Sequence, residues 1–122
     1  MSVHVNVVVL RGSLSSAPRE RELPSGSTLT LLEITTRVDD AVATVPVVIA
    51  DADAQVTTLA SGDEVVVVGR VTRRYFRAGG VTQSRTEVVA ERVVSAKRRR
   101  DCDRAIEQAA ELLNRSPTDP LV

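Results

Sequence analysis

The chain has 122 residues, with 16 basic and 16 acidic side chains and a formal net charge of zero, which suits one domain with one modest core. Its single cysteine, Cys102, excludes an internal disulfide, and together with the single histidine, His4, it cannot supply a four-ligand zinc site. The N-terminus lacks the features of a signal peptide and no apolar stretch is long enough to cross a membrane, so we expect a cytoplasmic protein without metal, cofactor or membrane partner.

Segments rich in Val, Ile, Leu and Thr predict three strands in the first half of the chain. The first is expected over residues 3–14, the second over 28–38 and the third over 42–50. A stretch rich in Pro, Ser and Gly predicts a loop between the first two strands. Asp39 and Asp40 predict a turn between the second and third.

The second half begins with a short helical connection, expected over residues 51–60, with Asp51 or Asp53 as its N-cap. The fourth strand is predicted over 64–77 and the fifth over 81–95. Five long strands with one short helix before the fourth are typical of the OB-fold, a small Greek-key barrel. We therefore predict an all-β protein with this fold, since a flat sheet would leave long apolar edges open to aggregation.

The C-terminal part has a different pattern. A basic run, Lys-Arg-Arg-Arg at residues 97–100, precedes a helix predicted over 101–115 with Asp101 as its cap. One apolar stripe of this helix is expected to pack on the barrel, with contact to another subunit as the alternative. The stripe consists of Cys102, Ile106, Ala109 and Leu113. The predicted organisation is an OB-fold domain over 1–96, then a basic linker, the helix and a short tail over 97–122.

Residues 70–85 carry five arginines and the only Tyr and Phe of the chain. Gly79 and Gly80 can both take positive φ, which a two-residue type I′ hairpin turn requires. Pairing outward from that turn sets Arg74 opposite Arg85, a like-charge pair that should lower stability, so we expect its removal to leave stability unchanged or improved. Side chains alternate along a strand, and one face of the hairpin therefore carries Arg70, Arg74, Phe76 and Arg85. The other face carries the second-choice contacts Arg73, Tyr75 and Arg77.

An aromatic ring among arginines suits a nucleic-acid strand, because cations contact phosphates and the ring stacks on a base. The charge distribution agrees: residues 38–69 contain six acids and no base, whereas residues 70–100 contain ten bases and two acids, a local charge of +8. A polyanion responds to such a local patch rather than to the net charge. The alternative is a solvated hairpin whose arginines only keep a sheet edge soluble.

The sequence contains none of the common catalytic motifs. The chain has no glycine-rich phosphate loop, no closely spaced pair of His or Cys residues and no serine in a nucleophile elbow. The Asp pairs fall at turn and capping positions, which explains them adequately. We expect a binding protein and not an enzyme.

Five short motifs, in this order, resemble bacterial single-stranded DNA-binding proteins over about residues 3–95. They are Val5-Asn6-x-Val8-x-Leu10-x-Gly12-x-Leu14 in the first strand, Leu23-Pro24-Ser25-Gly26 in the next loop, Leu32-x-Ile34-x-Thr36 in the second strand, Gly62-Asp63 through Gly69-Arg70-Val71 around the fourth, and Thr86-Glu87-Val88 in the fifth. The stretch Tyr75-Phe76-Arg77-Ala78-Gly79-Gly80 most resembles divergent actinobacterial members.

The resemblance implies an OB-fold that binds single-stranded DNA in replication, repair and recombination, assembled as a homo-oligomer, a dimer or tetramer, through its first strand. Phe76 stands where the family usually has a stacking tryptophan. The family's other stacking positions, near Asp39-Asp40, Thr44 and Ala50, hold no aromatic residue here. The acidic tip that recruits replication proteins is not found, so no such recruitment is expected.

The function that these observations favour is non-catalytic, largely sequence-independent binding of single-stranded DNA through the basic hairpin and Phe76. The missing aromatic residues favour an alternative, a degenerate OB-fold that serves as a protein-interaction or assembly module. RNA binding is a further alternative, because stacking and phosphate contacts do not read the 2′-hydroxyl.

Overall fold

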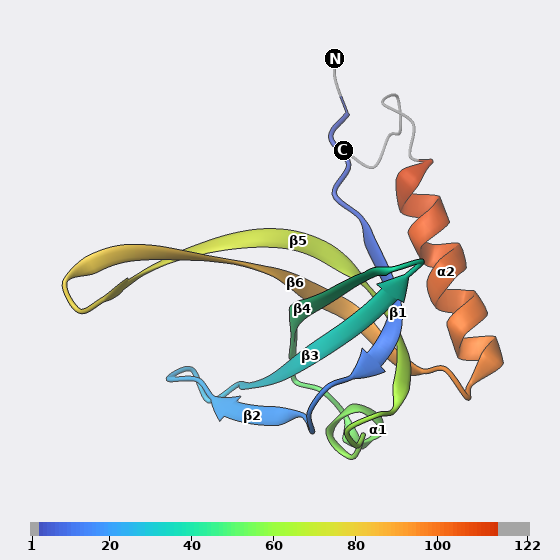
Figure 1. Cartoon of the computed structure of the whole chain (residues 1–122), viewed down its shortest axis with the longest axis horizontal. Coiled ribbons are helices and arrows are strands. Elements are labelled where there is room, and N and C mark those ends of the chain that lie inside the picture. The colour runs from blue at the N-terminus through green and yellow to red at the C-terminus, as the bar shows by residue number, and fades with distance from the viewer. Residues whose placement is uncertain (1–2, 115–122) are drawn as a thin grey trace.

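The computed structural model describes residues 3–114, and within this range it has six strands and two helices (Figure 1). The elements in chain order are β1 (Val8–Leu14), β2 (Arg19–Glu22), β3 (Thr28–Val38), β4 (Ala41–Ala50), α1 (Ala54–Thr57), β5 (Glu64–Ala78), β6 (Val81–Ser95) and α2 (Arg99–Leu113). Neither helix of this range is long and apolar enough to cross a membrane.

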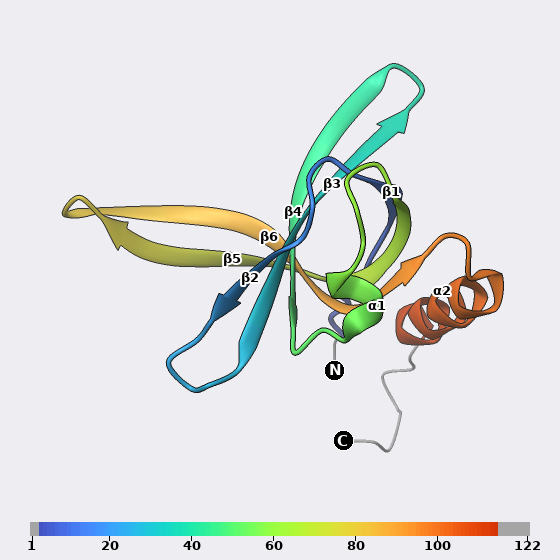
Figure 2. The ribbon, with the colours of Figure 1, turned by 90° about the horizontal axis from the view of Figure 1, so that it is seen from below.

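Five of the strands close into a barrel. Neighbouring strands pair in the order β1-β5-β6-β4-β3, and the end of β1 pairs again with β3 through Ser13 and Leu14 (Figures 1 and 2). All pairs are antiparallel except β4 with β6. Gly12 lies at the closing corner, where a Cβ atom would collide with the carbonyl oxygen of Thr35. With α1 between β4 and β5, this is the predicted OB-fold.

The apolar run in β5 is buried on both faces of its strand. Val65 and Val67 point into the barrel, where they share a core with Leu14, Leu32 and Ile34. Val66 and Val68 alternate to the outside, as the two-residue period of a strand requires, and they are covered by α2. One continuous run of valines therefore builds both the barrel core and the seat of the C-terminal helix.

The first strand is shorter than predicted. It begins at Val8, and residues 3–7 precede it without regular structure. The side chain of Asn6 takes the place of strand pairing, because its Nδ2 donates to the Val71 carbonyl (2.8 Å) and its Oδ1 accepts from the Val71 amide (3.0 Å). A side-chain amide that satisfies both backbone groups of the facing residue removes the need for a further ladder pair.

The loop predicted between the first two strands contains a strand of its own. β2 pairs antiparallel with the start of β3, from Arg19 opposite Leu31 to Glu22 opposite Thr28. Its four residues are all exposed, so it has no apolar alternation to detect in the sequence. Charged side chains are typical of such an edge strand because they discourage pairing with another chain.

Both helices are found, with different ends from those predicted. Asp53 is confirmed as the N-cap of α1 and accepts from the Gln55 amide at 3.0 Å, but this helix covers only four of the ten predicted residues. Asp51 instead accepts from the amide of Thr28 at 3.2 Å, which ties the end of β4 to the start of β3.

Helix α2 starts within the basic run and not at Asp101, since Arg98 is its N-cap and Asp101 lies in the first turn. The buried residues are Cys102, Ala105 and Ala109, which pack on β5 and β6. The predicted stripe is wrong for Ile106 and Leu113, which are 48% and 55% exposed, because small residues let the helix approach the sheet closely along another line. The predicted last helical residue, 115, lies outside the described residues, and the domain division at residue 96 stays a prediction.

Candidate nucleic-acid interface

The candidate interface is the hairpin formed by the distal halves of β5 and β6, which extends away from the barrel as an arm in both views (Figures 1 and 2). Gly79 and Gly80 have φ values of 60° and 78°, and Ala78 pairs with Val81 across them. The predicted two-residue turn is therefore confirmed.

The predicted register is confirmed as well. Arg74 pairs with Arg85, and Phe76 pairs with Gln83. Alternation then places four side chains on one face, which we call the hairpin face: Arg70, Arg74, Phe76 and Arg85. Phe76 is partly buried, and its ring centroid lies 5.5 Å from the guanidinium carbon of Arg74, within the range of a cation–π contact.

The backbone is tight where the arm leaves the barrel. The pairing of β5 with β6 shifts its register between Val68 and Gly69. A Cβ atom on Gly69 would collide with the carbonyl oxygen of Val89. Arg70 follows directly and pairs with Val89, so the close approach lies at the start of the hairpin.

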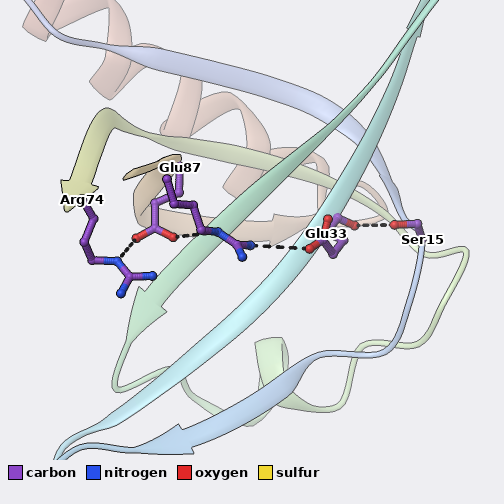
Figure 3. A network of polar contacts seen from close by, with 5 residues as sticks. Ser15, Glu33, Arg74 and Glu87 are labelled. Carbon is purple, nitrogen blue, oxygen red and sulfur yellow. Dashed lines mark hydrogen bonds and ion pairs between the residues drawn. The ribbon is translucent and has the colours of Figure 1, made fainter. Parts of the chain in front are cut away.

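A buried carboxylate lies between the two paired arginines, which the sequence reasoning missed. Glu87 is 6% exposed, and its Oε1 and Oε2 lie 3.3 Å from Arg74 Nε and 3.6 Å from Arg85 Nε (Figure 3). The expectation that the arginine pair is an unrelieved repulsion is therefore wrong. The signal was available, since Glu87 is two residues beyond Arg85 and pairs with Thr72, which places it on the hairpin face.

The network continues onto the barrel wall. Arg85 Nη2 lies 3.8 Å from Oε1 of Glu33 on β3. The carbonyl of Glu33 accepts from the Ser15 amide at 3.0 Å and from its hydroxyl at 3.3 Å (Figure 3). Alternating charges thus tie the base of the hairpin to β3, and two carboxylates offset the two arginines.

The arginines nevertheless remain accessible. The side chains of Arg74 and Arg85 are 50% and 42% exposed. Arg74 contacts Glu87 through Nε, and a guanidinium carries four further N–H donors on its two terminal nitrogens. Arg70 is exposed and forms no ion pair with another residue of the described part. A phosphate can therefore contact this face without breaking the Glu87 network.

The opposite face carries the second-choice residues. The guanidinium carbon of Arg73 lies 6.0 Å from the ring centroid of Tyr75. Tyr75 is 68% exposed, so it does not cover the end of the barrel. Arg77 Nη2 donates to the Gly80 carbonyl at 2.9 Å and so stabilises its own turn. The two faces are separated by the sheet, so one strand of nucleic acid lying flat on the arm contacts only one of them.

Among residues 3–114, no three His, Cys, Asp or Glu side chains come together in a group that could hold a metal ion.

A sequence model described as the single-strand binding protein family matches residues 5–96 of the chain. No curated protein matches the chain with significant sequence similarity.

Proposed function

The chain belongs to the single-strand binding protein family, and from this premise we propose that it binds single-stranded DNA through the hairpin face, without catalysis and with little sequence preference. Family members bind single-stranded DNA. We also propose that the chain acts in DNA replication, repair or recombination. Within the family, we propose that it is a divergent member of actinobacterial type. A cytoplasmic location stays a prediction.

The observation that carries the assignment to the hairpin is the contact between Arg74 and Phe76 on an exposed arm. The half-exposed cation can contact a phosphate, and the partly buried ring would stack on a base through the face that Arg74 does not cover. Stacking of this kind contributes about 1–3 kcal/mol per base and accepts any base. Arg73, Tyr75 and Arg77 are proposed as weaker contacts, for a strand that reaches around the arm.

The Glu87 network limits the electrostatic part of this binding. Each phosphate neutralised contributes about −0.7 to the slope of log affinity against log salt for a single strand. Because Glu87 and Glu33 already offset Arg74 and Arg85, we expect a slope shallower than the number of arginines on the arm suggests.

The edge of β1 supports assembly through this strand. β1 pairs with β5 along residues 8–13 but with β3 only at Ser13 and Leu14, so its outer edge at residues 8–12 is free of described partners. Val5 and Val9 beside it are 48% and 44% exposed. An open apolar edge favours pairing with a second copy of the chain, and we propose a dimer or tetramer, to be measured by multi-angle light scattering.

The ion pairs of Arg74 and Arg85 with Glu87 and Glu33 also favour a second candidate function. Arginines that are already offset by carboxylates could serve only to hold the hairpin on the barrel, and the fold would then be a protein-interaction or assembly module. This candidate predicts no binding of oligonucleotides even at low salt.

Fluorescence anisotropy with labelled oligo-dT at two salt concentrations separates the candidates. We expect Phe76→Ala to lower affinity by about 1–3 kcal/mol with an unchanged salt slope, because no charge is removed. Tyr75→Ala, on the other face, is the matched control and should have a smaller effect. Equal binding by the Phe76 variant and the wild type would show that the DNA-binding surface is not the hairpin face. Repeating the measurement with oligo-rU in place of oligo-dT tests the RNA alternative.

A further inference from the structure

A second group of cations gathers at the start of α2. Five basic side chains line one depression of about 450 Å³, together with Asp101. We call them the basic collar: Lys97, Arg98, Arg99, Arg100 and Arg104. The five side chains therefore border the same open depression at the start of the helix.

The charge of the collar is only weakly offset. Arg98 and Arg104 each place Nη1 3.8 Å from the carboxylate of Asp101, so two cations share one acid. Lys97, Arg99 and Arg100 are exposed and form no ion pair with another residue of 3–114. This differs from the hairpin, where Glu87 and Glu33 lie beside the paired arginines.

Apart from the two weak ion pairs with Asp101, the local structure gains nothing from these cations. Arg98 is the N-cap of α2 and makes no side-chain capping bond, and Arg99 and Arg100 open the first turn. Positive charge at this end opposes the helix dipole, and Ser, Thr, Asp or Asn would cap the helix better. A run of cations that disfavours its own helix is explained by an anionic ligand.

The collar is held in a definite place. α2 packs on Val66, Val68 and Val94 through its buried face. The start of the helix, which carries the collar, is therefore fixed relative to the barrel, unlike a free linker. In both views the hairpin and α2 lie at opposite ends of the long axis of the molecule, with the barrel between them (Figures 1 and 2). A strand bound on the hairpin must cross the barrel to reach the collar.

We propose that the basic collar is a second phosphate-binding surface, which takes the continuation of a single DNA strand bound at the hairpin. This inference rests on the proposed function. The collar contains no aromatic side chain, so it contacts phosphates without stacking bases and adds affinity that does not depend on sequence. Its contribution appears only when the strand is long enough to reach both surfaces.

The test compares two lengths of oligo-dT by fluorescence anisotropy. One has about 8 nucleotides, within the range that a single OB-fold covers, and the other has about 40. For Arg99→Gln with Arg100→Gln we expect roughly tenfold weaker binding of the long strand at low salt and a salt slope reduced by up to about 1.4, two phosphates' worth. Binding of the short strand and the melting temperature should not fall.

The matched control is Arg19→Gln with Arg21→Gln, which removes the same charge from the exposed strand β2. It should cause no length-dependent loss. If the collar variant binds the long strand as tightly as the wild type while Phe76→Ala weakens both lengths, the collar proposal is overturned and the hairpin proposal stands. An equal loss for both lengths would also overturn it, because the collar would then belong to the primary site.

A competition experiment tests whether the collar binds acidic proteins and not DNA. If polyglutamate displaces the long strand from the wild type as well as unlabelled oligo-dT does, the collar is a surface for acidic proteins and the nucleic-acid assignment is overturned. If the wild type binds neither oligonucleotide, the proposed function fails and the collar proposal fails with it. The distinguishing result for the collar remains a loss confined to the long strand.

Discussion

Removing both arginines that flank Glu87 should destabilise the protein, although the two are like charges paired across strands. In Arg74→Ala with Arg85→Ala, Glu87, which is 6% exposed in the wild type, loses both contacts of its carboxylate, at 3.3 and 3.6 Å. An uncompensated buried charge costs about 3–5 kcal/mol. Because the arginines are about half exposed and water can partly replace them, we expect a loss of about 1.5–3 kcal/mol, between that range and the 0–1 kcal/mol of a surface pair.

Each single variant leaves Glu87 with one partner, so the double variant should lose more stability than the sum of the singles. Adding Glu87→Gln to the double variant removes the orphaned charge and should recover part of the loss. Urea unfolding followed by circular dichroism at one fixed protein concentration measures these differences, with an unchanged m-value as the check on two-state behaviour. A double variant as stable as the wild type, or more stable, would refute the assignment of Glu87 as their counterion.

Three further predictions concern packing and binding. Ala105→Asp puts a charge at a position with 0% exposure and should lower stability by about 2 kcal/mol or more, whereas Ile106→Asp, one residue further along and 48% exposed, should have a much smaller effect in the same thermal melt. Gly12→Ala brings a Cβ atom against the Thr35 carbonyl oxygen at the barrel corner and should lower the free energy of unfolding by about 1–3 kcal/mol; an unchanged urea midpoint would contradict this close approach of β1 to β3. Phe76→Ala should leave the melting temperature nearly unchanged while it weakens binding of oligo-dT, and a parallel loss of both would make the ring structural.

Local rules were sufficient to find the five barrel strands and the hairpin. Two adjacent glycines specify the turn, and the two-residue period of a strand then fixes which side chains share a face. The register from Arg70 opposite Val89 to Phe76 opposite Gln83 follows from these rules alone. The OB-fold follows from the number and length of the apolar segments, because a barrel covers more of their edges than a flat sheet does.

Other features depend on partners that are distant in the chain. β2 has no apolar pattern and exists because the start of β3 offers it an edge to pair with. The start of β1 is set by the side-chain amide of Asn6, which bonds to Val71. The buried line of α2 runs through small residues because the valines of β5 and β6 require a close approach.

The charge of the hairpin face is the clearest case of a property that only the tertiary structure decided. Sequence alternation places Arg74, Arg85 and Glu87 on one side of the hairpin, but it does not say which of them is buried. Glu33 reaches the same cluster from β3 only because the barrel brings β3 beside the hairpin base. The energy of a charge depends on its solvent exposure and on every neighbour within a few ångströms, and a strand pattern specifies neither.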